Sequence, residues 1–154
     1  MAKPIPFRQS PQAARARENR TLLLPMPLAT CDDLALRVHI ALDAMRRGSG
    51  NVHAAQTLTQ AMILTGFLAE AGYGEATFEQ MRQAEADVSA AFDRGRGTGE
   101  WSLDDDAVDR FAVIVSTYDG QLRQAPLRVV AEASDRLERF RAGEPPALMA
   151  RKRA

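Results

Sequence analysis

The sequence holds one cysteine, Cys31, two histidines and no apolar run long enough to span a bilayer. A single cysteine excludes an intramolecular disulfide framework and a zinc site built on paired cysteines. A membrane-spanning helix needs about 20 consecutive apolar residues, and the best runs, Leu22–Leu28 and Ala61–Ala69, are far shorter. Residues 1–10 contain prolines where a signal peptide needs an apolar core. We therefore expect a cytoplasmic protein without a membrane partner.

The sequence also lacks the residue patterns that catalytic, metal and cofactor sites require. His39, His53 and Cys31 do not have the spacing of zinc ligands. No G-x-S-x-G elbow marks a nucleophile, and Gly48–Gly50 is typical of a turn between helices. The glycine- and arginine-rich segment Arg94–Gly99 lacks the G-K-[ST] of a phosphate-binding loop and indicates a flexible linker. We expect no catalytic residue, no metal ligand and no cofactor.

Charge is distributed unevenly along the chain, although the formal net charge is zero. Residues 1–20 carry a net charge of +4 and residues 141–154 a net charge of +3, so the stretch between them carries −7. Polar, basic ends of this kind are typical of disordered segments. We predict a disordered basic arm over residues 1–20, a helical domain over 21–142 and a disordered basic tail over 143–154.

The spacing of the apolar residues predicts an all-α fold, a single bundle of four to five helices. Capping residues mark four of the helix starts, at Thr30, Asn51, Thr77 and Ser102. Pro126 interrupts the last apolar stretch, which predicts two helices over residues 103–141 or one helix kinked at the proline. Two prolines within Leu22–Leu28 exclude a helix there, so this apolar segment is expected to be extended.

Residues 50–74 contain a Gly-Asn pair that begins a helix, an Ala-Ala pair and a Tyr-Gly end. The residues that carry this pattern are Gly50, Asn51, Ala54, Ala55, Leu58, Leu68, Tyr73 and Gly74. The segment resembles the helix-turn-helix of the Fis-type DNA-binding proteins. The resemblance implies two helices joined by a turn, with the second helix docked in the major groove through basic residues. In this sequence the equivalent stretch, 63–71, contains Glu70 and neither lysine nor arginine.

Three functional classes stay open at this point. The first and expected one is a non-catalytic interaction or regulatory protein, which binds another protein or a second copy of itself as a homodimer. Its candidate partner anchors are Leu22, Leu23, Leu24 and Trp101. The second is a nucleic-acid-associated regulator, acting through the Fis-like segment or through basic tails whose candidate contacts are Arg15, Arg17, Arg20, Arg151, Lys152 and Arg153. The third is a small-molecule enzyme with a pocket between helices.

Overall fold

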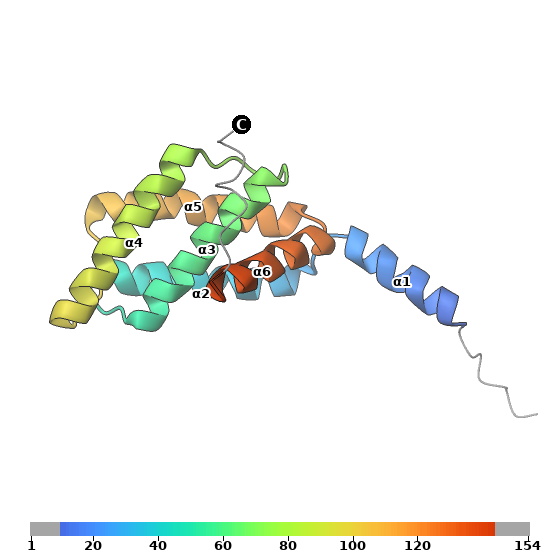
Figure 1. The fold of residues 1–154 in the computed structure, drawn as a ribbon, viewed down its shortest axis with the longest axis horizontal. Helices are drawn as coiled ribbons and strands as arrows, with labels where there is room; N and C mark the ends of the chain where they lie inside the picture. Colours follow the sequence, from blue (N-terminus) through green and yellow to red (C-terminus); the bar gives the residue numbers. More distant parts are fainter. Residues whose placement is uncertain (1–9, 144–154) are drawn as a thin grey trace, which may run out of the picture.

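A computed structural model of the chain describes residues 10–143 and shows a bundle of helices (Figure 1). In chain order the helices are α1 (Pro11–Leu23), α2 (Leu28–Arg46), α3 (Val52–Glu70), α4 (Phe78–Thr98), α5 (Asp105–Gln124) and α6 (Leu127–Arg141). Apart from an isolated bridge between Pro25 and Pro126, these described residues contain no β-structure. The prediction of an all-α fold is confirmed, with one helix more than expected.

The additional helix, α1, corrects the prediction of a disordered basic arm over residues 1–20. Residues 1–9 lie outside the described residues, and the remainder of the predicted arm is helical. The Ser10 hydroxyl accepts a hydrogen bond from the Ala13 amide (3.2 Å), and Pro11 stands in the first turn, where its missing N–H costs nothing. Alanine, arginine and glutamate follow, all of which favour helix. Capping and local propensity therefore outweigh the low hydrophobicity that indicated disorder.

The extended segment expected over Leu22–Leu28 spans only residues 24–27, between α1 and α2. The two prolines in this segment exclude it from either helix interior, as the sequence predicts. The backbone amide of Leu127 donates a hydrogen bond to the carbonyl of Leu24 (2.8 Å). The base of α1 is therefore attached to the first turn of α6.

We call the part of the molecule from α2 to α6 the body. Its core is built around α3 and α5. α3 packs against α2, α4, α5 and α6, and it carries more buried side chains than any other described helix. Its apolar centre predicted this burial. The largest fully buried side chains in the body include Phe111, Met45, Leu58, Leu68 and Leu122.

α4 continues through the glycine-rich segment that was expected to be a flexible linker. The helix ends only at Gly99, whose φ of +77° lies in the left-handed region that favours glycine. Gly95 lies within the helix, and the Trp101 ring rests against its backbone. Any side chain at this position would overlap the ring. This contact offsets the weak helix propensity of glycine, which the sequence pattern alone could not show.

α5 and α6 settle the alternative that Pro126 left open. The chain forms two helices, and α6 begins at Leu127, directly after the proline. Within the described residues, no helix combines the length and the hydropathy that a membrane crossing requires.

Candidate interaction site

α1 stands apart from the body and projects along the long axis of the molecule (Figure 1). None of its thirteen residues is buried, and its main neighbour in the body is α6, beside its base. An isolated helix of about 12–15 residues is only marginally stable in water. Tertiary packing therefore contributes little to the stability of α1, unlike that of the other five helices.

The structure places three of the predicted nucleic-acid contacts on α1. Arg15, Arg17 and Arg20 are all exposed, and within the described residues none of them forms an ion pair. Most arginines of the body, in contrast, are paired with a carboxylate. The other three predicted contacts, Arg151, Lys152 and Arg153, lie outside the described residues together with most of the predicted tail over 143–154.

Three exposed leucines lie within or beside the extended segment at the base of α1. Leu23 and Leu24 are 60% and 61% exposed, and Leu28, at the start of α2, is 64% exposed. Leu22 is half-buried. We call Leu23, Leu24 and Leu28 the leucine junction. Two of the predicted anchors therefore present apolar surface to solvent, and Leu28 was not among the predicted anchors because its exposure depends on how α2 packs.

Trp101, the fourth predicted anchor, is engaged within its own domain. Its indole is half-buried and meets the Phe92 ring edge to face, with 5.5 Å between the ring centroids. It also rests against Gly95. The residue therefore packs the end of α4 against the loop that leads into α5.

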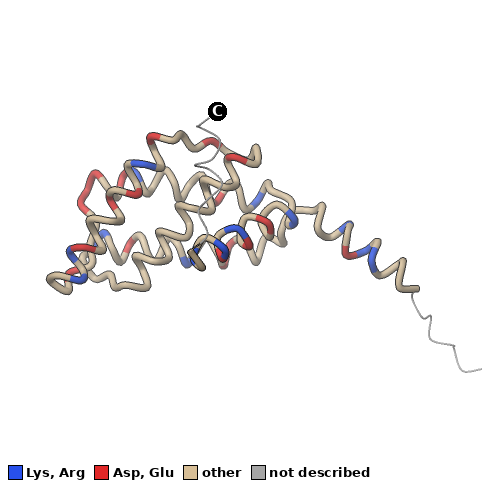
Figure 2. Tube along the Cα trace, viewed as in Figure 1, with Lys and Arg blue, Asp and Glu red and all other residues tan. Residues whose placement is uncertain are grey.

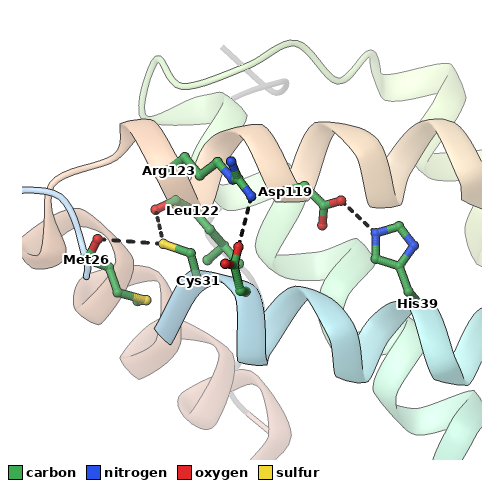
Figure 3. A network of polar contacts seen from close by, with 7 residues as sticks. Met26, Cys31, His39, Asp119, Leu122 and Arg123 are labelled. Carbon is green, nitrogen blue, oxygen red and sulfur yellow. Dashed lines mark hydrogen bonds and ion pairs between the residues drawn. The ribbon is translucent and has the colours of Figure 1, made fainter. Parts of the chain in front are cut away.

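The seam between α2 and α5 holds a histidine–carboxylate contact, an arginine–carboxylate ion pair and the cysteine (Figure 3). His39 Nε2 lies 2.7 Å from Asp119 Oδ2, and Arg123 Nη2 lies 2.9 Å from Asp32 Oδ1. Cys31 is 1% exposed, and its thiol donates a hydrogen bond to a backbone carbonyl of α5 at 3.2 Å. This is the packing role of a small buried side chain. Within residues 10–143, no group of three His, Cys, Asp or Glu side chains is arranged to hold a metal ion.

The pKa shifts in the body follow from ordinary structural contacts. Hydrogen bonds from Arg46 lower the pKa of Asp43, and hydrogen bonds from Arg82 lower the pKa of Glu79. Burial raises the pKa of Tyr118. Both carboxylates lie on the solvent side of their own helices, where such ion pairs contribute little to stability.

The Fis-like segment forms one unbroken helix. A helix-turn-helix has two helices joined by a turn, whereas α3 runs without interruption from Val52 to Glu70. Eight of its side chains are buried, among them Leu58 and Leu68, which belong to the resemblance. The face that carries these residues packs the core of the bundle.

Comparisons with known proteins are negative. No family model, no curated protein and no solved structure matches the chain. The resemblance to the Fis-type segment therefore stays a prediction.

Proposed function

We propose that this protein is a non-catalytic interaction protein and that α1 is the element through which it binds. The observation that carries the proposal is a helix that projects from the body with no buried side chain, and with three arginines that form no ion pair with any of residues 10–143. A helix with these features contributes nothing to the core, so its sequence is free to serve a partner. The homodimer expected from the sequence stays a prediction within this proposal.

The marginal stability of α1 supports this role. Isolated, it would spend part of its time unfolded, because thirteen residues form too few hydrogen bonds to repay helix nucleation. A partner that contacts the helical form would shift this equilibrium toward the helix. Segments that order on binding present large contact surfaces at moderate affinity, which suits a regulatory interaction.

In-cell photo-cross-linking tests the proposal. A photoreactive benzoylphenylalanine at Gln12, an exposed position of α1, is expected to form adducts with the partner. The same group at Glu85, an exposed position of α4, is expected to form none of these adducts. The measurement is the pattern of adducts after irradiation of the protein's native cells.

The matched control is a pair of substitutions at Ala16, in the middle of α1. Ala16→Pro breaks the helix and should abolish the adducts from position 12, whereas Ala16→Ser keeps the helix and should retain them. Neither change should move the thermal midpoint of the body, because Ala16 is exposed. Equal adduct patterns from α1 and α4, or adducts that survive the proline, would contradict the proposal.

A further inference from the structure

We infer that the partner of α1 is double-stranded DNA, and that the helix lies in the major groove with its arginines against the phosphates on both sides. This inference rests on the proposed function of α1. It adds the chemical class of the partner and the manner of contact.

The composition of α1 favours a polyanion over a groove on another protein. A helix that binds a protein groove offers large apolar side chains at positions such as i, i+4 and i+7. α1 has no such stripe, since its only large apolar residues, Leu22 and Leu23, stand at its last two positions. What it offers instead is charge: three arginines against a single acid, Glu18.

The positions of the arginines fit a groove with anionic walls. Arg17 and Arg20 are three residues apart and therefore share one side of the helix. Arg15 is two residues before Arg17, which places it on the opposite side at about 100° per residue. A helix with charges on both flanks matches the phosphate rows on the two edges of a major groove. The three small alanines of the first half, Ala13, Ala14 and Ala16, keep the helix narrow.

The shape of the helix distinguishes between kinds of nucleic acid. The major groove of B-form DNA is about 12 Å wide and admits an α-helix, which measures about 10–12 Å across with its side chains. The major groove of an RNA duplex is too narrow for this. Binding to single strands relies on aromatic side chains that stack on bases, and α1 has none. Double-stranded DNA is therefore the form that fits.

The charge of the body would orient the molecule on DNA. Residues 75–110 contain ten acidic and four basic side chains, and the acidic residues gather along α4 and the first half of α5, away from α1 (Figure 2). DNA would repel the side of the molecule that carries these acidic residues and attract the side that carries α1. Only α1 and the adjoining surface would approach the duplex, and because the contacts are to phosphates, the binding would be independent of base sequence.

The test is a salt series of fluorescence anisotropy with the full chain and a labelled 20-base-pair DNA of mixed sequence. The triple variant Arg15→Ala, Arg17→Ala, Arg20→Ala should lower affinity by on the order of 1,000-fold at about 50 mM salt, because each lost phosphate contact removes about 0.9 from the steepness of the decline of log K with log salt. The steepness should fall by about 2.7 in total. Duplex RNA and single-stranded DNA of the same sequence should bind at least about tenfold more weakly.

Two control variants keep the result interpretable. Removing the three exposed body arginines Arg37, Arg47 and Arg82 changes net charge equally and should alter the affinity by less than about threefold. Leu23→Ser with Leu24→Ser should also leave the salt slope unchanged, because uncharged side chains release no counterions.

The outcomes separate the inference from the proposed function. If DNA binding is absent, or falls equally in the α1 and the body variants, the DNA inference is wrong. Cross-links from position 12 to a protein would in that case still support the proposed function. If the leucine variant loses DNA binding while the arginine variant retains it, the leucine junction binds in place of the charges, and the groove geometry is wrong.

Discussion

Phe111→Ala is expected to lower the free energy of unfolding by about 3–5 kcal/mol, a large loss for a single truncation. Phe111 lies in the first half of α5 with no exposed surface, and it is the largest of the fully buried side chains among the described residues. Its removal forfeits the transfer of an aromatic ring from water and leaves a cavity that fixed neighbours cannot fill. Since small domains are stable by about 5–15 kcal/mol, the loss is a large fraction of the whole.

Chemical denaturation followed by circular dichroism measures this effect. The matched control is Val113→Ala, two positions away in the same helix and 54% exposed, which should change the free energy of unfolding by less than about 1 kcal/mol. Similar losses for both substitutions would mean that α5 does not present Phe111 to the core, and the packing described for the bundle would be incorrect.

Gly95→Ala is expected to destabilise the fold by about 1–3 kcal/mol, the size of effect that overpacking produces. The direction is opposite to what helix propensity predicts, because alanine is better than glycine inside a helix by about 1 kcal/mol. The methyl group would overlap the Trp101 ring, which also meets the Phe92 ring edge to face. The ring would have to leave its position. Because Trp101 is the single tryptophan, its emission should shift to the red as solvent reaches it.

Gly97→Ala provides the control in the same turn of α4. A side chain at Gly97 meets no atom within 4 Å, so the gain in helix propensity should appear undiminished, at about 0.5–1 kcal/mol of stabilisation. Tryptophan emission should stay constant. Stabilisation by both substitutions would show that Trp101 does not rest on Gly95.

Much of the fold could be predicted because helix caps and turns depend on residues that are neighbours in the sequence. The capping box at the start of α4 is present with both of its hydrogen bonds, from the Gln80 amide to the Thr77 hydroxyl (3.1 Å) and from the Thr77 amide to the Gln80 side chain (2.9 Å). The cap of α5 was misplaced by two residues. Asp104, in place of Ser102, accepts the hydrogen bond from Ala107, since a row of three aspartates offers several equivalent caps.

Features outside the local capping patterns were predicted less well, each for its own reason. The continuation of α4 through Gly95 depends on Trp101, which packs on the helix from the loop beyond it. The start of α2 moved from Thr30 to Leu28 because Pro27 serves as its N-cap residue. The helical state of α1 was missed for a different reason. A composition poor in apolar residues shows that a segment cannot form a hydrophobic core, but a capped segment of helix-forming residues can still be helical without packing into a core.

The arginines of the candidate site can be identified in the sequence, whereas their arrangement in space cannot. Charge counting along the chain identified Arg15, Arg17 and Arg20, since clustered like charges are visible without a structure. Their placement on opposite flanks of one helix became clear only once α1 was seen to be helical. The exposure of Leu23 and Leu24 depends on whether any groove of the body accepts them, and sequence patterns carry no information on that point.

The burial of Cys31 makes the protein a convenient object for labelling chemistry. Alkylating reagents need access to a thiolate. The native thiol should therefore react only when α2 and α5 separate, and its rate of modification measures how often the body opens. A second cysteine introduced into α1 would react at once. The two sites would then be distinguishable by time alone, and spin labels or cross-linkers could be attached to the projecting helix without first removing the natural cysteine.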